Sequence, residues 1–186
     1  MDTADVDESW WKRSSALFCP KCHRLRFPFL PLDLKLDTLI PSRTDMFMAD
    51  HSLMPLILSA RMVEALTTAH AFLHLGQVFQ IKDGVRHKMP FFSVTSRRPP
   101  VPLRGRNPSI QEGRPVSESE RVSVCSGCGI MSRRERSPWY LHADEVPQEP
   151  VFCTDLGLAV AQSLGETLKA LKLKQVRVER VAVVDH

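Results

Sequence analysis

The chain lacks the features that send a protein into or across a membrane. None of its apolar runs reaches the 18 or more residues of a membrane span, and residues 53–58 are interrupted by Pro55. Residues 1–15 begin acidic and contain neither a basic stretch nor an apolar core, so they do not form a secretory signal. Five cysteines among 186 residues are too few and of the wrong parity for a disulfide framework. We therefore expect a soluble, cytoplasmic protein whose thiols stay reduced.

Motifs of the common enzyme classes are also missing. The sequence has no G-x-S-x-G, no phosphate-binding loop, no H-E-x-x-H and no paired carboxylates in a recognisable frame. His70 and His74 stand one helical turn apart, but they lie in or beside an apolar stripe without a third ligand. Packing or surface roles are favoured for both histidines. The sequence thus indicates a protein that is not an enzyme.

Four of the five cysteines form two Cys-x-x-Cys pairs. Cys19 and Cys22 make the first pair, and the second pair, Cys125 and Cys128, begins 106 residues later. Two intervening residues let a tight turn aim both sulfurs at one point, and two such turns facing each other supply the four thiolates of a tetrahedral zinc site. The spacing predicts one structural zinc ion held by all four side chains.

The residues around the two pairs are mostly turn formers. Pro20 and Gly127 lie inside the pairs, and Gly129 after the second pair permits the positive φ that such turns often need. The first pair is less regular, because His23 occupies the position that corresponds to Gly129. The second half therefore resembles a zinc knuckle more closely than the first.

Other interpretations of the cysteines remain open. A thioredoxin-like redox centre needs one pair at a helix N-terminus, and here two pairs precede segments without a strong helical pattern. Two unconnected knuckles, or a site that has lost its metal, are further alternatives. Cys153, between Phe152 and Thr154, is most simply a small buried apolar residue.

The charge of the chain is too small to indicate a nucleic-acid partner. Its formal net charge is +4. A zinc ion with four thiolates carries about −2 in total, which would bring the loaded protein to roughly +2. Nucleic acid is therefore an unlikely partner on charge alone.

An internal repeat accompanies the two cysteine pairs. Residues 56–66 (LILSARMVEAL) align with residues 158–168 (LAVAQSLGETL), and both read as a short apolar strand that runs into a helix. Further matches place residues 46–47 with 151–152 and residues 75–78 with 173–176, so the offset drifts from 106 to 98 as small insertions would produce. Chance similarity of two amphipathic segments is the alternative. The alignment predicts two copies of one unit, over about 15–85 and 121–186, within a single domain spanning 1–186.

The local patterns predict an α+β fold with two pseudo-symmetric strand-helix-strand units joined by a zinc-ribbon-like four-cysteine site. Ser59 is the expected N-cap of a helix over 60–73, and residues 78–81 form the strand that follows it, closed by Asp83-Gly84. Residues 162–171 are the equivalent helix, although a longer helix starting near Thr154 also fits, and residues 176–184 are the equivalent strand.

Two further segments invite interpretation. Residues 96–117 are rich in Pro, Arg and Gly without periodicity, which is typical of a flexible connection between the halves. Residues 139–142 form an aromatic cluster that either packs in a core or over the zinc, or is exposed for a partner; core packing is favoured.

The residues described so far resemble the myxobacterial double-CXXCG motif family over nearly the whole chain. The resemblance lies in Phe18 before the first pair, in the two strand-to-helix segments, and in the second pair followed by Gly129. It places the family's paired cysteines on Cys19, Cys22, Cys125 and Cys128, and His23 departs from the family pattern. The resemblance implies a cytoplasmic immunity protein that neutralises a cognate polymorphic toxin by direct binding.

A nucleic-acid-binding zinc-ribbon module is the alternative from a different class. It would use a group of arginines, namely Arg97, Arg98, Arg104, Arg106, Arg133, Arg134 and Arg136. These arginines gather in a Pro-rich segment and one short run, whereas nucleic-acid ribbons usually concentrate basic and aromatic residues on one face. The oligomeric state, the toxin and the contacts with it are not encoded in any of these patterns.

Overall fold

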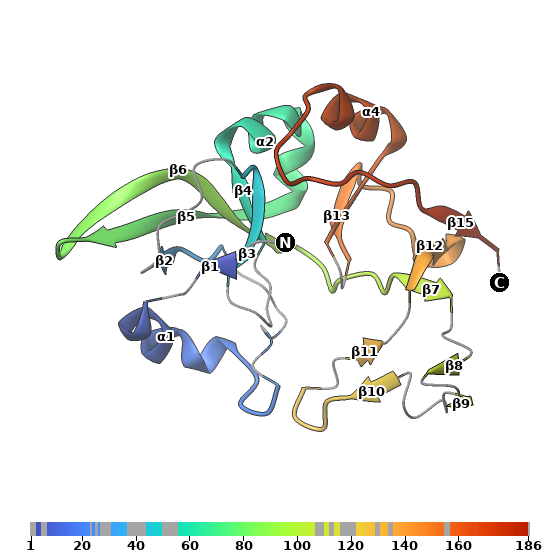
Figure 1. Cartoon of the computed structure of the whole chain (residues 1–186), viewed down its shortest axis with the longest axis horizontal. Coiled ribbons are helices and arrows are strands. Elements are labelled where there is room, and N and C mark those ends of the chain that lie inside the picture. Colours follow the sequence, from blue (N-terminus) through green and yellow to red (C-terminus); the bar gives the residue numbers. More distant parts are fainter. Residues whose placement is uncertain are drawn as a thin grey trace.

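The computed structural model describes residues 3–4, 7–22, 24, 26, 31–36, 44–49, 56–106, 110–111, 114–115, 122–128, 131–133, 136–154 and 157–185. Most of its regular elements are β-strands and only a few are helices, so the protein belongs to the α+β class, as the sequence predicted. Figure 1 shows the larger sheet with α1 on one side and α2 on the other, and the smaller sheets of the second half beside them.

The larger sheet has six strands, in the order β1-β3-β4-β6-β5-β2. The central strands pair antiparallel, whereas the two edge strands β1 and β2 each pair in parallel with their neighbour. The strands are β1 (Thr3–Ala4), β2 (Leu34–Leu36), β3 (Met46–Ala49), β4 (Leu56–Ser59), β5 (Leu73–Lys82) and β6 (Val85–Ser96).

The second half forms smaller sheets. A three-stranded sheet has the order β15-β12-β7, and three further pairs are antiparallel, namely β10 with β11, β13 with β14 and β8 with β9. The strands are β7 (Arg104–Arg106), β8 (Ile110–Gln111), β9 (Arg114–Pro115), β10 (Val122–Val124), β11 (Met131–Arg133), β12 (Arg136–His142), β13 (Val151–Cys153), β14 (Leu158–Val160) and β15 (Ala182–Val184).

The helices are short. Among the described residues the α-helices are α1 (Glu8–Ser14), α2 (Ala60–Ala65) and α4 (Gln162–Ala170), and the 3₁₀ turns are η1 (Ser15–Leu17), η2 (Thr67–Phe72) and η3 (Ala143–Glu145). Ser59 caps α2 as predicted, since its Oγ accepts a hydrogen bond from the Met62 N–H at 3.1 Å. The predicted helix over 60–73 is wrong beyond Ala65, because Thr67 adopts a φ of 49° and the chain continues as η2.

Strand β4 is buried on both faces, which explains its uninterrupted apolar sequence. Ile57 points into a first core, whereas Leu56 and Leu58 point to the opposite face of the sheet. The first core lies on the α1 side and contains Trp10, Phe18, Leu32, Leu34, Leu36, Phe47, Ile57, Val78 and Phe91.

A second core, here called the shared core, joins the two halves of the chain. It contains side chains of β4, α2 and η2 from the first half, and side chains of β13 and α4 from the second. Its fully or nearly buried members are Leu56, Leu58, Met62, Val63, Leu66, Ala69, Leu73, Val94, Val151, Cys153 and Leu168. Because both helices cover the same apolar surface, neither half can bury its helix face alone.

Asp45, the residue before β3, holds the segment that follows α4 through hydrogen bonds to Lys174. Its buried carboxylate accepts hydrogen bonds from the Ser59 hydroxyl at 2.6 Å and from the Lys174 backbone N–H at 2.8 Å. The Asp45 N–H in turn donates to the Lys174 carbonyl at 3.0 Å. Asp45 is 8% exposed, and each of its carboxylate oxygens accepts one hydrogen bond. Loss of either donor would leave a buried oxygen without a partner, which costs free energy, so both hydrogen bonds stabilise the fold.

The second half departs from the sequence predictions in two places. The alternative helix starting near Thr154 is wrong, because residues 158–160 form β14 and α4 begins only at Gln162. The predicted strand over 176–184 is wrong for its first part, and only Ala182–Val184 pair with a neighbour. Val176 and Val178 pack instead against the shared core, where their β-branched side chains are partly buried outside any strand.

Part of the Pro/Arg-rich segment, residues 101–103, packs into the second half, where the sequence indicated a flexible connection over 96–117. Residues 107–109, 112–113 and 116–117 of that segment lie outside the described part of the chain. Val101 and Leu103 are buried in a third core with Leu141 and Phe152, and Val101 bridges to Thr154 in parallel. Trp139 packs against this core too, so part of the aromatic cluster has the packing role that was favoured for it. Tyr140 contacts His142 edge to face, with 5.6 Å between the ring centroids.

We predict that Gly76→Ala destabilises the protein by about 3 kcal/mol, because the added Cβ would overlap the Leu32 carbonyl group and the Ser93 Oγ. Gly157→Ala is the matched control, since nothing lies within 4 Å of the position of its added Cβ. Urea unfolding of both variants measures the difference. Equal midpoints for the two variants would contradict the packing of β5 against residue 32.

Candidate metal centre

The first cysteine pair sits in a tight turn held by the backbone. The Cys19 N–H donates to the Arg24 carbonyl at 2.8 Å, and the Arg26 N–H donates to the Leu17 carbonyl at 2.9 Å. Buried Phe18 anchors this turn in the first core, where its ring meets that of Trp10 edge to face at 6.1 Å. The aromatic residue before the pair therefore fixes the position of Cys19, which is 0% exposed. His23 lies outside the described residues.

The second pair occupies the turn between β10 and β11. The two strands pair antiparallel with Val124 opposite Met131, so the turn at residues 125–128 is closed at its base. The Gly127 N–H donates to the Cys125 Sγ at 3.4 Å, a sulfur contact typical of such turns. Gly129, expected to relax this turn, lies outside the described residues.

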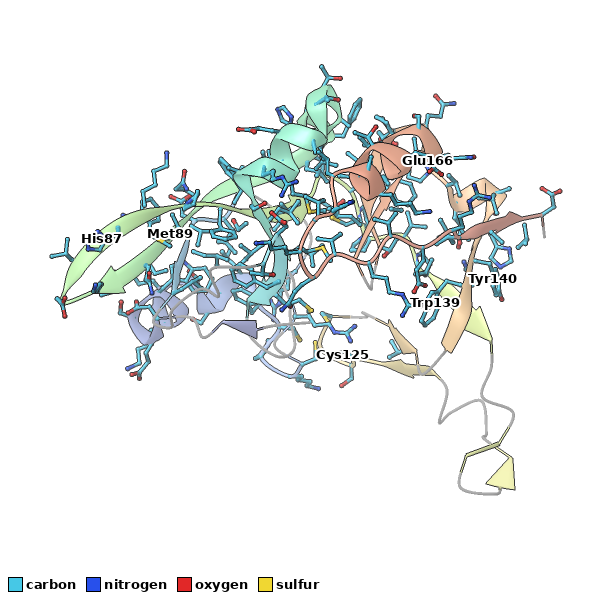
Figure 2. The ribbon with its side chains drawn as sticks, turned by 45° about the horizontal axis from the view of Figure 1, so that its top comes forward. His87, Met89, Cys125, Trp139, Tyr140 and Glu166 are labelled. Carbon is cyan, nitrogen blue, oxygen red and sulfur yellow. The ribbon has the colours of Figure 1, made fainter. Side chains whose placement is uncertain are left out.

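The two turns bring all four sulfurs together (Figure 2). The Sγ atoms of Cys19 and Cys125 are 3.7 Å apart, those of Cys22 and Cys128 are 3.5 Å apart, and all four lie within 4.8 Å of one another. Tetrahedral coordination with Zn–S bonds near 2.3 Å requires sulfurs about 3.8 Å apart. The four predicted ligands therefore lie close enough to hold a metal ion, and each half of the chain supplies two of them.

The protein around the sulfurs also fits a metal ion. A Cβ added at Gly127 would lie 2.9 Å from the Cys19 Sγ, so only glycine lets the second turn approach the first this closely. Lys21 Nζ donates to the Ser126 hydroxyl at 3.0 Å and links the tips of the two turns. Sequence reasoning identified Gly127 as a turn former but missed this contact role, and it gave no sign of the Lys21–Ser126 bond.

Backbone N–H groups favour the thiolate form of two of the cysteines. The N–H groups of Cys22 and Lys21 lower the pKa of Cys19 to about 6, and the Gly127 N–H lowers the pKa of Cys125. Burial raises the pKa of Cys22 to about 12, because a thiolate there loses its hydration. A bound cation would remove that penalty, and thiolates are the form that ligates zinc.

The remaining titratable candidates lie elsewhere. His70 is exposed on η2 and His74 is half-buried on β5, where burial and the charge of Arg97 lower its pKa. Within the described parts of the chain, no other cysteine, histidine or acidic side chains converge in a group of three or more. The two histidines thus take the packing and surface roles expected of them.

Comparisons with known proteins leave the site to be interpreted from its own geometry. No protein-family model, no curated protein and no solved structure matches this chain. Among the described residues, no helix combines the length and the apolar character that crossing a membrane requires.

We predict one tightly bound zinc ion per chain, lost in Cys125→Ser. Because the ion closes a loop of about a hundred residues, its removal should lower the free energy of unfolding by several kcal/mol. Metal analysis of protein never exposed to chelator, followed by urea unfolding with and without chelator, measures both effects. Cys153→Ala is the control, since it removes the one cysteine outside the cluster and should keep the zinc. Full stability of metal-free Cys125→Ser would contradict the assignment.

Cys153 should make stability fall at alkaline pH. It is 1% exposed, and burial raises the pKa of its thiol from 9.0 to about 11. Between these values the unfolded chain releases a proton that the folded chain keeps, so stability declines as pH rises through this window. We expect a loss of about 1.4 kcal/mol between pH 8 and pH 10 that is absent in Cys153→Ala. Urea unfolding of both proteins at both pH values measures it, and parallel losses would contradict it.

Proposed function

We propose that the four cysteines hold a structural zinc ion. Four protein thiolates complete the tetrahedral shell of zinc and leave no position for water or substrate, so the ion would hold the fold and do no chemistry. All five cysteines are free thiols in the structure. Reduced thiols suit a cytoplasmic protein, because an oxidising compartment would convert closely spaced cysteines to disulfides.

We infer further that the chain is a duplicated unit with pseudo-two-fold symmetry. The β3–β4 ladder sets Met46 opposite Leu58, and the β13–β14 ladder sets Val151 opposite Val160. Met46 and Val151, like Leu58 and Val160, are separated in sequence by nearly the same number of residues as the two cysteine pairs. Both separations lie within four residues of the 106 residues between Cys19 and Cys125. A common origin explains why two separate antiparallel pairs share one register.

Two further pairings support the duplication. Strands β2 and β5 are parallel with Leu34 opposite Val78, and β12 and β15 are parallel with Tyr140 opposite Ala182. The shift from Leu34 to Tyr140 is 106 residues and the shift from Val78 to Ala182 is 104 residues, so the ladders match Val78 with Ala182 and not with Val176, its counterpart in the sequence alignment. Around the cysteines, the hydrogen bond between residues 26 and 17 corresponds to the pairing of residues 132 and 123. In this interpretation each copy contributes one zinc-ribbon-like turn to a single metal site.

The biological role that fits these features best is that of an immunity protein. We propose that it binds and neutralises a cognate polymorphic toxin without turnover, as the resemblance to the double-CXXCG family implies. The observation that carries the proposal is the four-sulfur cluster, because a fully protein-ligated metal site supports a rigid binding scaffold. Specificity would then lie in exposed side chains, where a few anchors dominate the affinity.

The nucleic-acid alternative loses support from the positions of its arginines. Arg98 forms an ion pair with Glu149 at 2.8 Å, and Arg104 forms a bidentate pair with Glu145. The Arg97 guanidinium donates to the Leu73 carbonyl at 3.4 Å. Arg134, together with the side chains of Arg106, Arg133 and Arg136, lies outside the described part of the structure. Guanidinium groups already bound to carboxylates and carbonyls are poorly placed to contact phosphates.

We predict that this protein restores the growth of cells that express the toxin encoded beside its gene. We also expect the two proteins to co-purify in a one-to-one complex. Expression of the toxin alone and with Cys125→Ser provides the comparison, since the unfolded variant should not protect. If the toxin kills equally with and without the intact protein, and no complex is recovered, the immunity proposal is wrong. Binding to RNA and DNA over a range of salt concentrations would then test the alternative.

A further inference from the structure

The hairpin of β5 and β6 extends beyond the sheet to which it belongs. Strand β4 pairs with β6 only at residues 91–94, and β2 pairs with β5 only at residues 34–36 opposite 78–80. The distal part of the hairpin, residues 79–89, overlaps β2 only at residues 79 and 80 and is here called the arm. It reaches away from α2, α4 and the smaller sheets in Figure 1, and Figure 2 shows His87 near its free end.

The arm is held rigidly at both ends. At its tip, Asp83 and Gly84 have φ values of 51° and 74°, the positive values of a two-residue turn that matches the twist of a hairpin. At its base, Gln77 Nε2 donates to the carbonyls of Met89 and Phe91 at 3.0 and 3.2 Å, across an irregularity in the ladder. Met89 packs against the first core. The arm therefore presents a fixed shape.

Its side chains carry an unusual local excess of positive charge. Residues 82–88 are all exposed, and among them Lys82, Arg86 and Lys88 are cations whereas Asp83 is the single acid. Among the described residues, no carboxylate forms a salt bridge with any of these three cations. By contrast, Arg98 and Arg104 in the second half are paired with glutamates.

The cations are distributed over both faces of the arm. Lys88 is opposite Phe79 and Arg86 is opposite Ile81, so these four share one face. The Arg86 guanidinium carbon lies 3.3 Å from the centroid of the Phe79 ring, a cation–π contact that holds its charge in place. Lys82 is on the other face, opposite Val85, which is 56% exposed.

We propose that the arm is a docking element for an acidic cleft or groove on a partner protein. A rigid hairpin with cations on both faces and an exposed valine near its tip complements a concave surface lined by carboxylates. Arginine held on an aromatic ring loses little entropy on binding, which suits an interface anchor. This inference deepens the proposed function, because it identifies the part of the immunity protein that enters the toxin.

A protein partner is favoured over single-stranded RNA by the same contacts. Proteins that bind single strands stack bases on exposed aromatic rings along a basic groove. The aromatic ring of the arm, Phe79, is already covered by Arg86, and Asp83 places a negative charge at the tip. Charged residues can also protect a free sheet edge from pairing with another chain, and this alternative would explain the lysines on the arm. It does not explain the Arg86–Phe79 stack or the exposed Val85.

The first test measures the anisotropy of labelled poly-L-glutamate, and separately of a labelled single-stranded RNA, with the full-length zinc-loaded protein. Lys82→Glu/Lys88→Glu leaves the Arg86 stack intact and should weaken poly-L-glutamate binding about tenfold or more. Lys169→Glu/Lys172→Glu, on and just after α4, makes the same charge change on exposed residues away from the arm and should change it little. Zinc content and urea midpoints confirm that both variants fold.

The outcomes separate the arm from the proposed function. Equal weakening by both variants, or no binding of poly-L-glutamate by the intact protein, overturns the docking proposal. Tighter, arm-dependent binding of the RNA overturns it in favour of nucleic acid. If the toxin co-purifies with the intact protein and equally with Lys82→Glu/Lys88→Glu, the arm proposal is wrong while the immunity proposal stands. If the arm binds poly-L-glutamate but no toxin is captured, the docking element stands and the immunity proposal fails.

Discussion

The convergence of four sulfurs is the constraint on which the arrangement of the two halves depends. It joins Cys19 to Cys125 across most of the chain, and the close approach leaves no room for a side chain at Gly127. The shared core makes the same connection on the other side of the larger sheet, where α2 and α4 cover common apolar surface. A polar cluster and an apolar layer thus fix the same relative orientation by different forces.

Features that depend on neighbouring residues were predictable from the sequence. The Cys-x-x-Cys turns, the Ser59 cap and the Asp83-Gly84 turn each follow from local stereochemistry, and all three occur where expected. The four cysteines of the candidate metal centre were predictable for the same reason, because each pair defines its own turn. Only the meeting of the two turns required a long-range assumption.

Features that depend on distant partners were not predictable in this way. Val176 and Val178 alternate as a strand would, yet they lie outside any strand and are partly buried against the shared core. The arginines of residues 97–106 suggested a solvated connection, but Val101 and Leu103 between them are buried and Arg104 is paired with Glu145. Helix α2 ends at Ala65, although the apolar pattern continues, since η2 turns the chain back toward β5. For the two valines and for residues 97–106, the deciding partner lies far away in sequence.

The hydrogen bonds of Asp45 affect how the protein can fold during its synthesis. The second oxygen of its carboxylate accepts its hydrogen bond from the N–H of Lys174. The sulfurs of Cys19 and Cys22 likewise lie beside those of Cys125 and Cys128, more than a hundred residues later in the chain. The emerging first half therefore carries two thiols whose partners follow only at residues 125 and 128, and a carboxylate whose second donor follows only at residue 174. Contacts so distant in sequence form slowly, so folding of this chain is expected to be limited by the docking of its second half.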